Sequence, residues 1–152
     1  MNEKLKMKNE KYLTEWGMNE EWKMLSWVEN EWKIINMSRE NVIVDKSYAF
    51  AKKIVELYII LSKEHREYIL SKQILRSGTS IGANIQEAQS GFSKKDFIYK
   101  VQISLKEANE THYWLRLLKD TNFILPEKAN ELLKDVEDII NILTAILKTS
   151  KK

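Results

Sequence analysis

Apolar residues recur at alternating steps of three and four along most of the chain, the spacing that places them on one side of an α-helix. Four such stretches are separated by short polar segments. They predict helices from about Asp45 to Lys63, from about Glu64 to Ser90, from about Lys94 to Thr121, and from Pro126 to a Lys-rich C-terminal tail.

Each predicted helix carries a stripe that we expect to be buried. In the first helix the stripe is Tyr48, Ala51, Ile54 or Val55, Tyr58 and Leu61. In the second it is Ser71, Ile74, Gly78, Ile81, Ile85 and Ala88. In the third it is Phe97, Val101, Ser104, Ala108, Thr111, Leu115 and Leu118. In the fourth it is Ala129, Leu132, Leu133, Val136, Ile139, Ile140, Leu143, Ile146 and Leu147.

Several residues signal where these helices begin. Ser93 is a candidate N-cap, with Asp96 three residues later in an acidic first turn. Pro126 is well placed at a first helical position, where its missing N–H costs nothing. Asp45 or Ser47 can cap the first helix.

The connections near His65, at Ser90–Ser93 and at Asn122–Leu125 are short, so successive helices must run antiparallel. The predicted fold is therefore all-α, an antiparallel up-down-up-down four-helix bundle.

The composition agrees with this fold. The 152 residues suffice for one domain, and 43% hydrophobic with 31% charged residues can form a core in water. Four Gly and one Pro provide too few turns for a β-sandwich or barrel. No apolar run approaches the length of a membrane span, and the N-terminus lacks a signal-peptide core. We therefore expect a cytoplasmic protein with no membrane partner.

Residues 1–36 differ from the rest and are expected to form an N-terminal extension, helical from about Glu20 to Ile35, ahead of a bundle domain at 37–152. The extension is either a docking arm or sequence upstream of a natural start at Met37, and we favour the second interpretation. It contains four of the five tryptophans, Trp16, Trp22, Trp27 and Trp32.

The sequence offers little for catalysis. The absence of Cys excludes thiolate chemistry, disulfides and Cys-based metal sites. A di-iron bundle needs Glu-x-x-His, but Ser62 and Asn109 stand three residues before His65 and His112. There is no glycine-rich phosphate loop. We expect no enzymatic activity, no catalytic residue, no metal and no cofactor.

The segment QILRSGTSIGANIQEAQSG, residues 73–91, departs from an ordinary helix. Gly78 and Gly82 each cost about 1 kcal/mol relative to Ala inside a helix. Close approach of another helix is the simplest compensation, and a break at Thr79–Ser80 is the alternative. Small residues would permit the approach while isoleucines fill the remaining space. These residues are Ser77, Gly78, Ser80, Gly82 and Ala83, with Ile74, Ile81 and Ile85.

Two polar residues of this segment need partners. If Asn84 is buried, its amide must be hydrogen-bonded. Glu87 is expected to pair with Arg76 or Lys72.

Two runs of residues, taken together, are specific enough to indicate a family. The run RSGTSIGANIQE begins at Arg76 and ends at Glu87, and the run KEANET begins at Lys106 and is followed by Trp114. Over about residues 39–148 the chain resembles the "four helix bundle protein" family, with Ala88 in place of the family's usual small Gly. This family includes proteins encoded in intervening sequences of bacterial 23S rRNA genes and the accessory variability determinant of diversity-generating retroelements. The helix-packing and oligomer motif so marked is Ser77, Gly78, Ser80, Ile81, Gly82, Ala83, Asn84, Ile85, Glu87 and Trp114.

The resemblance implies a homopentamer, a ring of five bundles around a channel, that binds nucleic acid, above all RNA. In the retroelement members the ring engages a reverse transcriptase and its template RNA. Residues 37–152 carry 19 Lys and Arg against 15 Asp and Glu, so five copies would bring together a charge of +20. Candidate RNA-binding residues are Lys52, Lys53, Lys72, Arg76, Lys94, Lys95, Lys100, Arg116 and Lys119.

One of these candidates has a different expected role, and one alternative function is open. Arg76 lies inside the motif and is expected to be structural first. The alternative function is a protein-interaction module of an rRNA intervening-sequence element that recruits a partner through exposed aromatics, Phe92, Tyr99 and Tyr113, without binding nucleic acid.

Overall fold

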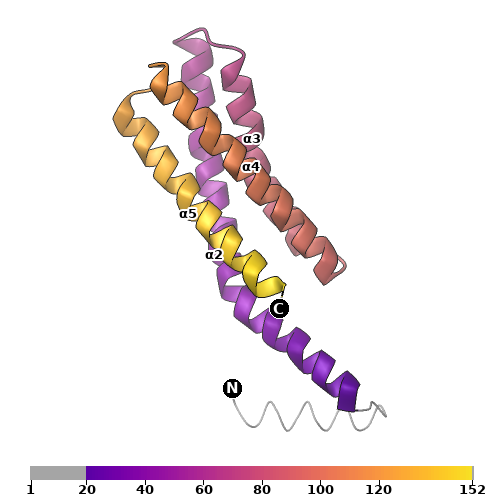
Figure 1. The fold of residues 1–152 in the computed structure, drawn as a ribbon. Helices are drawn as coiled ribbons and strands as arrows, with labels where there is room; N and C mark the ends of the chain where they lie inside the picture. Colours follow the sequence, from indigo (N-terminus) through magenta and orange to yellow (C-terminus); the bar gives the residue numbers. More distant parts are fainter. Residues whose placement is uncertain (1–19, 152) are drawn as a thin grey trace. The chain divides into compact units, whose positions relative to one another are not determined.

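The computed structural model describes the backbone of residues 20–151 and the side chains of residues 42–151. Four helices account for most of this range: α2 (Glu20–Lys63), α3 (Leu70–Gln89), α4 (Lys94–Asp120) and α5 (Pro126–Ser150) (Figure 1). No strand occurs among the described residues. The all-α prediction is confirmed.

The chain divides into two structural units, Met1–Ser38 and Arg39–Lys152, and the bundle lies in the second. The helix expected from about Glu20 to Ile35 falls within α2, which continues to Lys63. The tryptophans considered as a docking arm, Trp16, Trp22, Trp27 and Trp32, lie outside the residues whose side chains are described.

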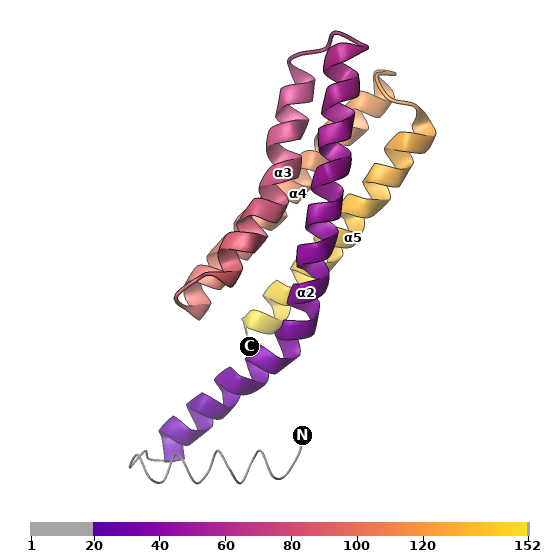
Figure 2. The same cartoon turned by 180° about the vertical axis from the view of Figure 1, so that it is seen from behind.

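The bundle has the predicted antiparallel order. The connections α2–α3 and α4–α5 lie at one end, and the α3–α4 connection lies at the other (Figures 1 and 2). Helix α3 packs beside α2 and α4, and α5 closes the bundle against α2 and α4. Each helix thus has two neighbours.

The predicted stripes of α3 and α4 are confirmed, and the buried set of α3 gains only Ser77. In α5, Leu133 and Ile140 are only half-buried, and the other predicted positions are buried.

The stripe predicted for α2 was only partly right, because its members Ile54 and Leu61 are buried but Tyr48 and Val55 are not. Tyr48 is 67% exposed and Val55 is 40% exposed. Apolar residues surround this helix on several sides, so periodicity could not select the buried one. The buried stripe is Ile43, Ser47, Phe50, Ile54, Leu57 and Leu61.

The helix boundaries follow local hydrogen bonds. Ser93 caps α4 by accepting the N–H of Asp96 at 3.1 Å, and Pro126 begins α5, both as predicted. Ser47 does not cap a helix, because α2 continues through it and its hydroxyl donates to the Val44 carbonyl at 3.1 Å. The Asp45 cap is wrong for the same reason.

Helix α3 begins at Leu70, six residues later than predicted. The Glu67 carboxylate accepts backbone N–H groups from Ile69, Leu70 and Ser71 at 2.9, 2.8 and 2.6 Å. These bonds satisfy donors that a helix leaves unpaired at its N-terminus. Burial opposes ionisation of Glu67, but the three backbone donors outweigh it and lower its pKa.

The two glycines of α3 lie against α2. A Cβ at Gly78 would lie 2.8 Å from Cγ2 of the fully buried Ile54, closer than packed carbons approach. A Cβ at Gly82 would lie 3.4 Å from Oγ of Ser47, an ordinary contact. The helix is unbroken at Thr79–Ser80, so the alternative of a break is wrong.

Candidate nucleic-acid interface

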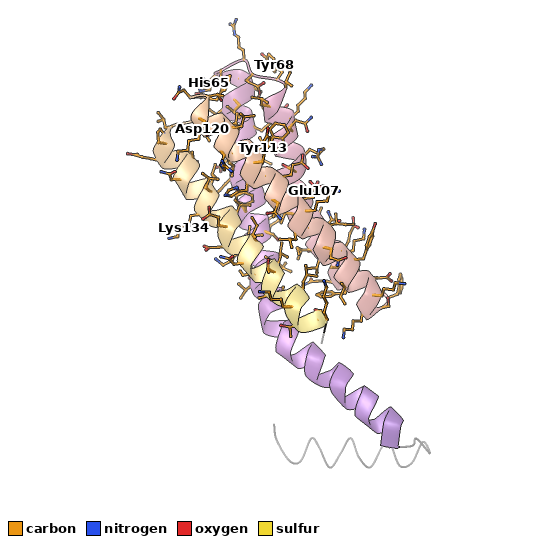
Figure 3. The ribbon with its side chains drawn as sticks, in the orientation of Figure 1. His65, Tyr68, Glu107, Tyr113, Asp120 and Lys134 are labelled. Carbon is orange, nitrogen blue, oxygen red and sulfur yellow. The ribbon has the colours of Figure 1, made fainter. Side chains whose placement is uncertain are left out.

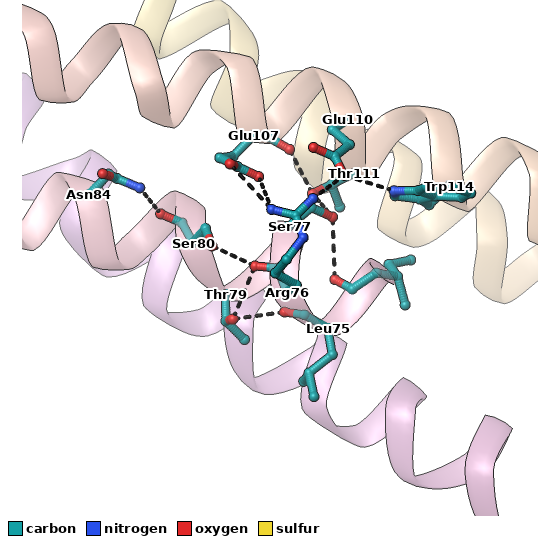
Figure 4. A network of polar contacts seen from close by, with 11 residues as sticks. Leu75, Arg76, Ser77, Thr79, Ser80, Asn84, Glu107, Glu110, Thr111 and Trp114 are labelled. Atoms are coloured by element: carbon teal, nitrogen blue, oxygen red, sulfur yellow. Dashed lines mark hydrogen bonds and ion pairs between the residues drawn. The ribbon is translucent and has the colours of Figure 1, made fainter. Parts of the chain in front are cut away.

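Arg76 occupies the seam between α3 and α4. Its Nη1 donates to Glu107 Oε2 at 3.2 Å, and its Nη2 donates to Glu110 Oε1 (Figure 4). Trp114 Nε1 also donates to Glu110 Oε1, at 3.1 Å. The hydrogen bond from Arg76 is the main reason that the pKa of Glu110 lies below its ordinary value.

The expected pairing of Glu87 with Arg76 or Lys72 was wrong. Glu87 Oε2 accepts from Lys100 Nζ at 2.5 Å, also across the α3–α4 seam. Position 87 lies about three turns beyond position 76 on α3, so the two residues meet different parts of α4. The bond to Glu87 raises the pKa of Lys100.

Lys53 also connects two helices by ion pairs, on the other side of the bundle. Its Nζ lies 2.9 Å from Glu131 Oε1 and 2.7 Å from Asp135 Oδ2, and these bonds join α2 to α5. The hydrogen bond to Asp135 is the largest cause of a raised pKa at Lys53. Of the nine basic candidates, Lys53, Arg76 and Lys100 therefore have carboxylate partners within the bundle.

The other six candidates are spread over three helices. Lys52 lies over the ring of Tyr48, 5.3 Å from its centroid, and Lys119 Nζ donates to Asn130 Oδ1 at 2.8 Å. Lys94 is exposed at the first position of α4. The candidates that are exposed and for which no ion pair with a described residue is seen include Lys52, Lys72, Lys95 and Arg116.

Four residues of the resemblance motif, Ser77, Gly78, Ile81 and Ile85, are buried in the interior of the bundle. Thr111 Oγ1 donates to the buried Ser77 Oγ at 3.0 Å, and Ser104 Oγ donates to the Ile81 carbonyl at 2.9 Å. These bonds satisfy hydroxyl groups that would otherwise be buried without partners.

Three motif residues lie farther from the core. Ser80 Oγ donates to the Arg76 carbonyl at 2.6 Å, and Asn84 Nδ2 donates to the Ser80 carbonyl at 2.8 Å, so both bond to their own helix. Ala83 is exposed and does not belong to the close helix contact in which the sequence analysis placed it.

A stripe of polar and aromatic side chains runs along the outer face of α4. Its members follow one another at steps of four and three, so they share one side of the helix, and all seven are exposed. None is acidic. We call this set the α4 outer stripe: Lys95, Tyr99, Gln102, Lys106, Asn109, Tyr113 and Arg116.

Four members of this stripe were predicted from the sequence for separate reasons, but Gln102, Lys106 and Asn109 were not. The signal that could have found them is the same four-three periodicity, applied to the polar side of α4. The exposed stripe of a helix has the same residue spacing as its buried stripe, because both follow the helical turn.

Comparison with known proteins places the chain. The protein family described as "23S rRNA-intervening sequence protein" matches residues 39–145. The chain belongs to this family. The match covers all of the bundle except the end of α5, and it includes both runs that carried the resemblance.

A solved structure is similar to this member of the family. It is a Bacteroides thetaiotaomicron protein of unknown function from the S23 ribosomal protein family, with 52% sequence identity and a TM-score of 0.71. The similarity covers 72% of this chain and 98% of that one. No curated protein matches the chain.

The described residues offer neither a metal site nor a membrane span. Within the described residues, no three His, Cys, Asp or Glu side chains are grouped so that they could hold a metal ion. His112 Nε2 lies 3.1 Å from Glu137 Oε1, an isolated pair between α4 and α5. No helix in the described part of the chain is both long and apolar enough to span a membrane.

Proposed function

We propose that this protein is a non-catalytic RNA-binding protein that acts as a homo-oligomer. The observation that carries the proposal is the α4 outer stripe, which presents three cations and no carboxylate on one exposed line. RNA is a polyanion, and cations arranged in this way attract it by releasing its counterions.

The ion pairs inside the bundle support this assignment. Arg76 is paired with both Glu107 and Glu110, and Lys100 is paired with Glu87, so two of the three negative charges of these carboxylates are offset within the α3–α4 seam. A phosphate chain lying along the α4 outer stripe would therefore meet Lys95, Lys106 and Arg116, with the negative charge of Glu107 and Glu110 partly offset by Arg76.

Self-association is supported by apolar residues that α2 leaves exposed. Tyr48, Val55 and Ile59 lie toward one side of the helix, and Val42 and Ile60 lie toward another. A closed ring uses two different patches on each subunit, one for each neighbour. Five subunits around a channel is the number implied by the family resemblance.

The partners of such a ring would be a reverse transcriptase and the template RNA of that enzyme, by analogy with the retroelement branch of the resemblance. The competing function is a protein-interaction module without direct RNA binding. Its support is the exposure of Phe92, Tyr99 and Tyr113, which are 102%, 60% and 56% exposed.

Fluorescence anisotropy with a labelled RNA at two salt concentrations separates the two functions. If three cations contact phosphates, affinity should fall about 20-fold between about 50 and 200 mM salt. Absence of binding at the lower concentration, with a protein partner still captured, would support the competing function.

Light scattering coupled to gel filtration tests assembly. We expect the wild-type chain to elute with the mass of an oligomer and Val55→Asp to lower that mass. Tyr68→Asp, at the end of the bundle, is the matched control and should leave the mass unchanged. A monomeric wild-type protein would contradict the self-association part of the proposal.

A further inference from the structure

We infer that the α4 outer stripe recognises single-stranded RNA by stacking bases on Tyr99 and Tyr113, an inference that rests on the proposed RNA-binding function. The two rings are 60% and 56% exposed on the same line of α4. An exposed aromatic ring can stack on a base only where the base face is free, as it is in a single strand. A duplex hides its base faces.

The spacing of the stripe fits an extended strand. Tyr99 and Tyr113 are separated by about 21 Å along the axis, at about 1.5 Å per residue. The whole stripe, from Lys95 to Arg116, extends over about 31 Å. Lys106 lies midway between the tyrosines, where a strand joining the two stacked bases would carry its phosphates.

The amide side chains complete the chemistry of the stripe. Asn109 is exposed and its Nδ2 donates to the Leu105 carbonyl at 3.0 Å, which leaves the amide oxygen as the atom that would accept from a base amino group. Gln102 lies one turn beyond Tyr99 and is exposed. Amides can both donate to and accept from base edges, and such edges are open in an unpaired strand.

Neighbouring side chains hold Tyr113 in place. The Tyr113 and Trp114 rings meet edge to face, with centroids 5.0 Å apart and planes at 73°. Trp114 donates its N–H to Glu110, and Glu110 is held by Arg76 (Figure 4). Arg76, which the sequence suggested as a direct RNA contact, therefore acts as a positioning residue for the Tyr113 ring on which a base would stack.

The test compares matched surface tyrosines. Figure 3 shows Tyr113 on α4 and Tyr68 at the α2–α3 end of the bundle, and the two are equally exposed at 56%. Binding of a labelled, unstructured RNA of about 15 nucleotides, long enough to follow the stripe, is measured by anisotropy. A double-stranded RNA and a single-stranded DNA of the same sequence are measured beside it.

We expect the double variant Tyr99→Ala/Tyr113→Ala to bind the single-stranded RNA at least about tenfold more weakly. The double variant Tyr99→Phe/Tyr113→Phe should bind as the wild type does, because the ring faces remain. Tyr68→Ala should have no effect. In wild-type protein, 2-aminopurine placed in the RNA should be quenched on binding, and the double Ala variant should abolish the quenching.

Several results would overturn the inference. One is a Tyr99→Leu/Tyr113→Leu variant with wild-type affinity, which would indicate apolar contact without stacking. Others are equal binding of duplex and single strand, tighter binding of the DNA, or a loss of oligomer mass in the double Ala variant with RNA affinity unchanged.

The experiments distinguish failure of the proposed RNA binding from failure of base stacking alone. If the tyrosine variants bind normally but Lys106→Ala weakens binding and the control Lys134→Ala on α5 does not, RNA binding stands and base stacking is wrong. If wild-type protein binds none of the three nucleic acids, the proposed function fails and this inference fails with it.

Discussion

Replacing each helical glycine of α3 by alanine should have opposite effects at two positions one turn apart. Both substitutions remove the flexibility of Gly in a helix, which stabilises the folded state by about 1 kcal/mol. At Gly82 the new Cβ meets Ser47 at an ordinary contact distance of 3.4 Å, so this gain should remain. Gly82→Ala should therefore raise stability by up to about 1 kcal/mol.

At Gly78 the same methyl group has no room. It would lie 2.8 and 2.9 Å from Cγ2 and Cγ1 of Ile54, a β-branched side chain that is completely buried. Overfilling a packed contact costs about 1–3 kcal/mol, which outweighs the helix term. Gly78→Ala should therefore be destabilised by about 1 kcal/mol, and the two variants should differ by about 1–3 kcal/mol.

The assay is urea and thermal unfolding followed by circular dichroism. All proteins must be compared at one concentration, because assembly adds to apparent stability. A difference of 1 kcal/mol corresponds to about 2–4 °C in Tm for a chain of this size. If Gly78→Ala is as stable as Gly82→Ala, the account of close packing between α2 and α3 is wrong. In an Ile54→Ala background, which lacks both crowded carbons Cγ1 and Cγ2, Gly78→Ala should no longer be destabilising.

Two further predictions concern polar groups. Glu67→Ala should lower stability by about 1 kcal/mol at neutral pH, because α3 loses its N-terminal acceptor. Since the folded-state pKa of Glu67 is lowered, its stabilisation is complete above the ordinary value of 4.5 and is lost as pH falls. The gap in urea midpoint between Glu67→Ala and wild type should therefore close in acid, and a gap independent of pH would contradict this account. Thr111→Val should cost about 1 kcal/mol by removing the buried bond to Ser77. The control Thr144→Val loses only a bond within α5 and should be nearly neutral in the same unfolding experiment.

Much of the candidate site depends on contacts between different helices, and the sequence does not specify which residues meet in those contacts. The partners of Arg76 are 31 and 34 positions away on α4, and the partners of Lys53 are 78 and 82 positions away on α5. Any nearby acid on a compatible face was an equal candidate, so Glu87 was paired with the wrong helix. The register between two helices decides these pairs, and it results from packing along their whole length.

Local chemistry was sufficient elsewhere. Ser93 and Pro126 begin helices because their bonds and backbone angles involve only the next few residues. The buried stripes of α3 and α4 also followed from the sequence, since each of these helices has one clearly apolar side.

The amino-acid sequence by itself determined the four helices, their antiparallel order and the small-residue contact in α3, because turns of 3.6 residues and short connections act over a few positions. Tertiary structure decided which side of α2 is buried, which acids neutralise Arg76, Lys53 and Lys100, and which cations remain along α4. These outcomes depend on the distance between side chains of different helices, and that distance exists only once the bundle has packed.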